Sequence, residues 1–252
     1  MYTFTSRVRF SEIDERGVLS IPALVNYLQD CSTFHSEHMG MWPEHVRETG
    51  RTWLLSAWEI EIGRLPRFGE EIAVSTWATG FKGLRANRNF CVCEAGDEDR
   101  EHPLVWADSS WFMFDSKAGR PIRIPTDEVA PYESDIEHDK PLDLPPIPRI
   151  LRATAPGKPA APVIVTAAHL DTNHHVNNAQ YVSMALGALS EQADGRDGGA
   201  TPAIRRLDVH YSQAAKLGDT ILPHIHREPD GSVIVTLDNE DDRPFAIVRI
   251  SG

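Results

Sequence analysis

Apolar side chains recur at spacings of three and four in two segments of the chain, the pattern of a helix with one buried face. The first segment begins at about Ile21 and ends near Gly40, and the second begins at about Asn177. Pro22 suits a first helical turn because its missing N–H needs no partner there, and Asn177 or Asn178 suits a helix cap. The predicted stripes are Ile21, Leu24, Leu28, Cys31 and Phe34 in the first helix, and Tyr181, Met184, Ala185, Ala188 and Leu189 in the second.

Four segments between these helices carry aromatic and β-branched residues bounded by turn signals, and they predict β-strands. Their ranges are 52–65, 70–81, 84–95 and 104–125, with hairpin turns at Gly96-Asp97 and Ala118-Gly119. A long helix beside an antiparallel sheet is an α+β architecture.

The same order of elements occurs twice along the chain. Asp14 precedes the first helix and Asp171 the second, and after each helix a strand leads to a glycine-acid turn, Gly69-Glu70 or Gly218-Asp219. The proline-rich segment 141–162 predicts an extended linker, because proline fixes φ and lacks an N–H. We therefore expect two domains, 1–140 and 163–252, each with a helix wrapped by a curved sheet. The glycine-rich run 192–199 predicts a turn after the second helix.

Composition narrows the class of protein. No run approaches the ~18 uncharged apolar residues of a membrane helix, and the N-terminal residues lack the apolar core of a signal peptide. Three cysteines, Cys31, Cys91 and Cys93, cannot build a disulfide framework and suit a reducing compartment. The net charge of −12 argues against a nucleic-acid partner. We expect a cytoplasmic protein without a membrane span.

The densest polar cluster covers residues 170–181, directly before the second helix. Asp171, Asn173 and His175 alternate there, and this spacing places three side chains on one side of an extended or looped segment. The N–H groups from Val176 to Asn178 belong to the helix start, lack intrahelical partners and favour negative charge. A carboxylate can activate water, an imidazole can move protons near neutral pH, and amide donors stabilise an oxyanion. From the residues alone, the alternative is an ordinary helix cap with a turn.

Other candidate chemistry is weaker. Cys91 and Cys93 share one face of a predicted strand, but no second pair or nearby histidine completes a zinc set, so we predict no metal site. The sequence has no glycine-rich phosphate loop and no Gly-x-Ser-x-Gly elbow, which argues against nucleotide enzymes and α/β-hydrolases.

The polar cluster resembles the signature of plant and bacterial acyl-ACP thioesterases, Asp-x-Asn-x-His-Val-Asn-Asn-x-x-Tyr. The segment SEIDERGVLSIPALVNYLQD (11–30) resembles the first helix of the bacterial members, and segment 53–84 resembles their strand pair with its Pro-Arg-x-Gly turn. The positions that match the signature are Asp171, Asn173, His175, Val176, Asn177, Asn178 and Tyr181.

This resemblance implies a tandem (double) hotdog whose N-terminal domain binds the acyl chain and whose C-terminal domain carries the catalytic residues, with no cofactor. Asp171 would be base or nucleophile, Asn173 would orient the substrate carbonyl or a water, and His175 would polarise the carbonyl or shuttle protons. The substrate-binding residues that it implies are Val176, Asn177, Asn178 and Tyr181.

One position departs from the family pattern. Family members often place a Glu, followed in plant forms by a Cys, after the strand that follows the second helix. Here that position is Ala214 and no Cys is present, which argues against a cysteine nucleophile. If the family Glu is needed, catalysis would be weakened, altered, or supported by Gln213 or His210.

We expect hydrolysis of fatty acyl-ACP to free fatty acid and holo-ACP. The alternatives are an acyl-CoA thioesterase, a non-catalytic acyl-thioester-binding hotdog and a hotdog dehydratase. Acyl carrier protein (ACP) is acidic, so a carrier-dependent enzyme needs a local basic patch; the alternative for the best candidate stretch is an ordinary solvated face. Acyl chain length and the choice between monomer and homodimer stay open. The stretch comprises Arg64, Arg67, Lys82, Arg85 and Arg88.

Overall fold

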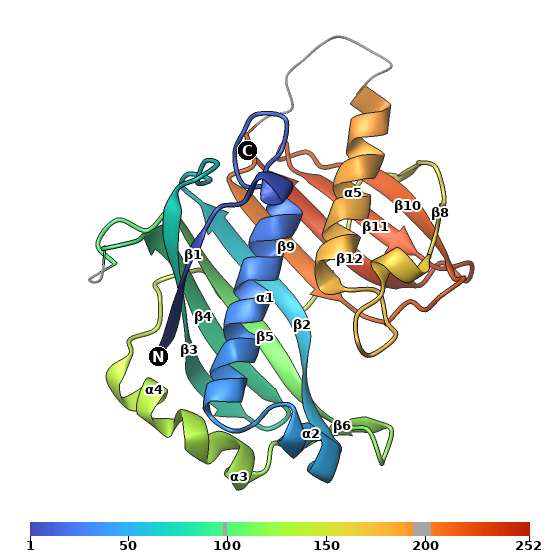
Figure 1. Ribbon diagram of the computed structural model, residues 1–252. Helices are drawn as coiled ribbons and strands as arrows, with labels where there is room; N and C mark the ends of the chain where they lie inside the picture. Colours follow the sequence, from blue (N-terminus) through green and yellow to red (C-terminus); the bar gives the residue numbers. More distant parts are fainter. Residues whose placement is uncertain (98–99, 194–202) are drawn as a thin grey trace. The chain divides into compact units, whose positions relative to one another are not determined.

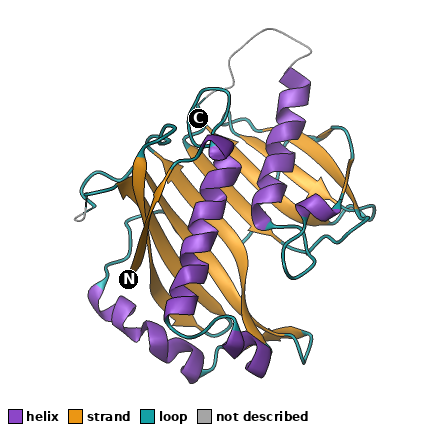
Figure 2. Ribbon diagram, viewed as in Figure 1, coloured by secondary structure: helices purple, strands orange, loops and turns teal. Residues whose placement is uncertain are grey.

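The computed structural model describes residues 1–97, 100–193 and 203–252. The chain divides into two compact units, Met1–Ile147 (unit 1) and Pro148–Gly252 (unit 2). Each unit contains one long helix and an antiparallel sheet, coloured purple and orange in Figure 2. The boundary lies inside the segment 141–162 that we expected to be a linker.

Unit 1 has the strand order β1-β3-β4-β5-β2, with β6 paired to β5, and every pairing in it is antiparallel. The long helix α1 lies across one face of this sheet (Figure 1). All four predicted strand segments are confirmed, whereas the short helices were not anticipated. The elements are β1 (Tyr2–Arg7), η1 (Phe10–Glu12), α1 (Ile21–His38), α2 (Glu44–Thr49), β2 (Arg51–Ile62), β3 (Glu71–Lys82), β4 (Arg85–Glu94), β5 (Val105–Asp115), β6 (Arg120–Ile122), α3 (Thr126–Val129), η2 (Ala130–Tyr132) and α4 (Glu133–His138).

Helix α1 begins and ends where the sequence predicts, but its apolar stripe differs at one position. Ser20 caps the helix, since its Oγ accepts the N–H of Ala23 at 3.4 Å. The prediction for Phe34 was wrong: this side chain is 40% exposed and packs edge-to-face against Phe4. His35 is fully buried instead. At about 100° per residue, position 35 lies on the line of the buried stripe and position 34 lies well to one side.

His35 belongs to a buried polar network between α1 and the sheet. Arg88 Nη1 donates to His35 Nδ1 at 2.8 Å and to Thr76 Oγ1 at 3.2 Å, and its guanidinium lies over the ring of Tyr132. Burial, together with the neighbouring Arg88 charge, lowers the pKa of His35 to about 2. The imidazole is therefore neutral at physiological pH, and the pair contributes one buried positive charge rather than two.

The predicted basic stretch is consequently not a continuous cationic surface. Arg88 is buried because its place on β4 points toward α1, and Arg64 is bonded to Glu70 at 2.7 Å and to Glu94 at 2.5 Å. The members of the stretch that remain exposed are Arg67, Lys82 and Arg85.

Unit 2 repeats this architecture with the strand order β9-β12-β11-β10-β7, in which β8 also pairs with β10. Helix α5 packs against β10, β11 and β12 (Figure 1). Most of the predicted turn at 192–199 lies outside the described residues. The elements are β7 (Lys158–Pro159), β8 (Val163–Ile164), η3 (Ala167–His169), α5 (Asn178–Ala193), β9 (Arg206–Tyr211), β10 (Thr220–Arg227), β11 (Val233–Asp238) and β12 (Pro244–Ser251).

The proline-rich segment is attached to the units at both of its ends. In unit 1, the N–H of Leu142 donates to Asn89 Oδ1 at 2.9 Å. In unit 2, Leu151 packs against Ile234 and Ile247, and Lys158–Pro159 adds the short edge strand β7 to β10. Proline is tolerated at an edge because one side of such a strand needs no ladder hydrogen bond.

Candidate active site

The loop before α5 is folded by the carboxylate of its first residue. In this Asp171–His175 loop, Asp171 Oδ1 accepts the backbone N–H of Asn173 at 2.8 Å and of His175 at 3.3 Å. The N–H of Asp171 donates to the carbonyl of His175 at 2.8 Å. His174 has a positive φ of 59°, a left-handed conformation that is uncommon outside glycine. The structure thus brings Asp171, Asn173 and His175 into one tight loop.

Unit 1 contains a second copy of this loop, from Asp14 to Val18. Asp14 Oδ1 accepts the backbone N–H of Arg16 at 2.9 Å and of Val18 at 3.4 Å, and the N–H of Asp14 donates to the carbonyl of Val18 at 2.9 Å. Gly17, with φ of 75°, stands where unit 2 has His174. These matching bonds confirm the internal repeat that the sequence predicts.

The two copies differ at the second carboxylate oxygen. In unit 1, Asp14 Oδ2 is occupied by Arg16, whose Nε and Nη2 lie at 2.9 Å and 2.6 Å. In unit 2, the equivalent residue is Asn173, which is exposed, and Asp171 Oδ2 has no hydrogen-bond partner among the described residues. His175, half-buried, replaces Val18. Only the unit 2 loop therefore combines an open carboxylate oxygen with an amide and an imidazole.

Two of the N–H groups expected to form an anion site at the start of α5 already have backbone partners. The N–H of Val176 donates to the carbonyl of Ala215 and that of Asn177 to the carbonyl of His169, both at 2.9 Å. These two N–H groups therefore cannot be the open donors that we expected, because the chain runs antiparallel to neighbouring backbone before the helix begins. Asn177 caps α5 instead, since its Oδ1 accepts the N–H of Ala179 at 2.9 Å.

Tyr181 lies behind the loop rather than in the open. Its side chain is 2% exposed, and its hydroxyl oxygen accepts the N–H of Ala215 at 2.8 Å. Burial raises the pKa of Tyr181 to about 12, so the phenol stays protonated at neutral pH. Ala214, which stands at the family Glu position, and the neighbouring Gln213 are exposed. His210 lies half-buried on β9.

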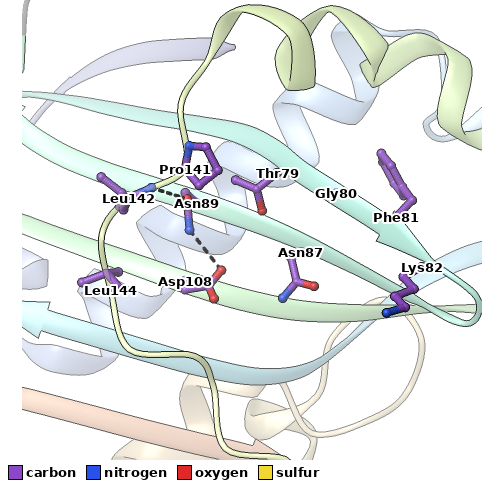
Figure 3. Close-up of a pocket in the computed structure, with 10 residues that line it drawn as sticks. All are labelled: Thr79, Gly80, Phe81, Lys82, Asn87, Asn89, Asp108, Pro141, Leu142 and Leu144. Carbon is purple, nitrogen blue, oxygen red and sulfur yellow. Dashed lines mark hydrogen bonds between the residues drawn. The ribbon is translucent and has the colours of Figure 1, made fainter.

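A separate pocket of about 360 Å³ lies in unit 1 (Figure 3). Arg88 points toward α1, so strand alternation puts Asn87 and Asn89 on the opposite face of the sheet. Asn89 Nδ2 donates to Asp108 Oδ1 at 3.0 Å, and burial raises the pKa of Asp108 to about 6. A hydrocarbon chain here would cover amide and carboxyl groups without satisfying them, so the pocket does not suit an acyl chain. Its lining comprises Thr79, Gly80, Phe81, Lys82, Asn87, Asn89, Asp108, Pro141, Leu142 and Leu144.

Two features are absent from the described part of the chain. No group of three or more His, Cys, Asp or Glu side chains there could hold a metal ion. No helix there combines the length and the apolar content that a membrane crossing requires.

Comparisons with known proteins agree with the architecture. Residues 1–132 match the family model of the acyl-ACP thioesterase N-terminal domain, and residues 160–243 match that of the C-terminal domain. A chloroplastic palmitoyl-acyl carrier protein thioesterase of Gossypium hirsutum is 25% identical over 90% of this chain and 60% of its own length. The chain spans about half the length of the curated relatives it matches.

Solved structures resemble the whole chain. A Lactobacillus plantarum protein assigned as an oleoyl thioesterase superposes with a TM-score of 0.80 at 26% identity, covering 99% of this chain and 94% of that one. An acyl-ACP thioesterase from Bacteroides thetaiotaomicron gives a TM-score of 0.82 at 22% identity, covering 98% and 96%. The fold is thus the tandem hotdog, as the sequence resemblance implied, with one hotdog in each unit.

Proposed function

Since the chain belongs to the acyl-ACP thioesterase family, we propose that it hydrolyses fatty acyl-ACP to free fatty acid and holo-ACP. The observation that carries this proposal is the difference between the two copies of the loop. Arg16 donates to the second carboxylate oxygen of Asp14, whereas Asp171 Oδ2 accepts no hydrogen bond from the described residues and its loop carries Asn173 and His175. Where the unit 1 loop has an arginine and a valine, the unit 2 loop has an amide and an imidazole, groups that acyl transfer uses.

The proposed steps follow from these groups. Water attacks the thioester carbonyl carbon and gives a proton to Asp171 Oδ2, because Oδ1 is occupied by two backbone N–H groups. The Asn173 amide donates to the developing oxyanion, a role that the N–H groups of Val176 and Asn177 cannot take. That proton then passes from Asp171 to His175, the C–S bond breaks, and His175 delivers the proton to the departing thiolate, which restores both side chains. The products are a fatty acid and the carrier thiol.

The choice of ACP as carrier rests on the family match rather than on surface charge. The chain carries a net charge of −12, and the exposed cations of the expected stretch number only three, Arg67, Lys82 and Arg85. Electrostatic attraction of an acidic carrier is therefore local at best. Binding of the acyl chain by the N-terminal unit is part of the same proposal, by analogy with the family. So is a cytoplasmic location, supported by three buried, unpaired cysteines.

The test presents one acyl chain, dodecanoyl, on ACP and on CoA and measures release of free thiol and of dodecanoic acid. We expect turnover of both, with the larger kcat/KM on ACP. A larger kcat/KM on CoA would instead establish an acyl-CoA thioesterase. Tight binding without release of thiol would favour an acyl-thioester-binding protein, the alternative that Ala214 raises. Because that outcome leaves the fold unchanged, it would overturn the activity alone.

A further inference from the structure

Both backbone polar groups of Ala215 form hydrogen bonds. Its N–H donates to the Tyr181 hydroxyl at 2.8 Å, and its carbonyl accepts the N–H of Val176 at 2.9 Å. The residue is fully buried, so no water can replace either partner. One bond ties the segment after β9 to the first turn of α5, and the other ties it to the residue that follows His175.

Unit 1 has the same connection built from different residues. The N–H of Leu19 donates to the carbonyl of Pro66 at 2.8 Å, as that of Val176 does to Ala215. Three residues further along, Gly69 donates to Val8 and Gly218 donates to Val165, both at 3.0 Å. This register makes Pro66 the counterpart of Ala215. The matching loops and helices make Leu24 the counterpart of Tyr181.

The two pairs differ in how they avoid a buried backbone N–H without a hydrogen-bond acceptor. Pro66 has no N–H, and the side chain that faces the equivalent place, Leu24, is apolar and fully buried. Ala215 has a buried N–H that would be costly without an acceptor, and here the helix supplies the hydroxyl of Tyr181. The proline fixes its backbone covalently, whereas the alanine depends on the tyrosine.

We propose that Tyr181 is a positioning residue for the reaction: its hydroxyl fixes Ala215, Ala215 fixes Val176, and Val176 places the adjoining His175. This inference rests on the proposed function only for its kinetic consequence. A second tyrosine supports the same helix start, since the Tyr211 hydroxyl donates to the carbonyl of Asn178 at 3.2 Å. Tyr181 itself contacts no reacting atom, because its hydroxyl is buried against Ala215.

The test is Tyr181→Phe, with Tyr181→Phe/Ala215→Pro as rescue and Tyr27→Phe as matched control. Tyr27 is a buried tyrosine of α1 whose hydroxyl donates to Glu12 Oε2 at 2.8 Å, so its variant also removes a buried hydroxyl, but from unit 1. We expect Tyr181→Phe to lower kcat about tenfold or more with little change in KM. The rescue variant, which removes the orphaned N–H, should recover kcat to within about threefold, and Tyr27→Phe should keep it.

Two outcomes would overturn the proposal: an unchanged kcat in Tyr181→Phe, or a double variant no faster than the single one. If Tyr181→Phe does not fold, Tyr181→Leu/Ala215→Pro, which copies the unit 1 pair, takes its place; a low kcat in that folded variant would also overturn it. Amide hydrogen exchange at Val176 reads the same contact without turnover. Faster exchange in Tyr181→Phe, reversed in the double variant, supports the positioning role of Tyr181 even if the wild type proves not to hydrolyse thioesters. Unchanged exchange refutes that role.

Discussion

His175→Ala is expected to lower kcat for acyl-ACP hydrolysis by about 10²–10⁴-fold, the range that positioned acid–base groups contribute. The His175 imidazole is the group assigned to deliver a proton to the departing thiolate. The folded loop should persist, since its bonds to residue 175 involve only the backbone. Steady-state release of thiol from dodecanoyl-ACP gives the rate, and circular dichroism verifies the fold.

The matched control for this variant is His174→Gly. It removes the neighbouring imidazole and installs the residue that unit 1 uses at the same left-handed position, Gly17. We expect its kcat to stay within about threefold of the wild type. Equal losses in the two variants would mean that the loop, rather than the His175 imidazole, controls the rate.

Asp108→Asn is expected to stabilise unit 1 at pH 7 by about 1–3 kcal/mol, since one pKa unit corresponds to about 1.4 kcal/mol and the carboxyl is partly buried. Burial raises its pKa from the ordinary 3.8 to about 6, so the folded state holds this proton more tightly than the unfolded state does. The free energy of unfolding contributed by this group therefore falls as pH rises from about 4 to 6 and stays low above that.

Urea unfolding of wild type and Asp108→Asn at pH 4 and pH 7 measures this difference. The stabilisation should be present at pH 7 and nearly absent at pH 4. Asp115→Asn, at the end of the same strand β5, serves as control and should not be stabilised at pH 7, because the Asp115 carboxylate accepts the N–H groups of Lys117 and Ala118. An Asp108→Asn protein less stable than the wild type at pH 7 would indicate that the carboxylate is fully satisfied in the fold.

Local patterns predicted those features that depend on neighbouring residues. The limits of α1, the cap by Asn177 and the strands of unit 1 follow from periodicity, turn residues and capping chemistry, all encoded within a few positions. The repeat was also visible, because Asp14 and Asp171 keep the same distance from the helix that follows. Phe34 is misplaced because a 3-4 spacing allows either of two neighbouring positions, and apolar character alone favours Phe34 over His35.

Features that depend on distant partners were not predictable. Whether the N–H of Val176 is open depends on the carbonyl of Ala215, which is distant in sequence. The burial of Arg88 likewise depends on which face of β4 meets α1. One signal was available but unused: aligning the two halves pairs Tyr181 with Leu24 and Ala215 with Pro66. That exchange points to a structural role for Tyr181 instead of the substrate contact that we expected.

The most direct test compares Asp171→Asn with Asp14→Asn in hydrolysis of dodecanoyl-ACP. Both substitutions leave an oxygen able to accept the loop N–H groups, and each removes one carboxylate from the same position of a duplicated loop. If the open carboxylate of unit 2 activates water, Asp171→Asn loses at least about 10²-fold in kcat and Asp14→Asn retains the wild-type rate. Equal activity in the two folded variants would contradict the assignment of the chemistry to the Asp171–His175 loop.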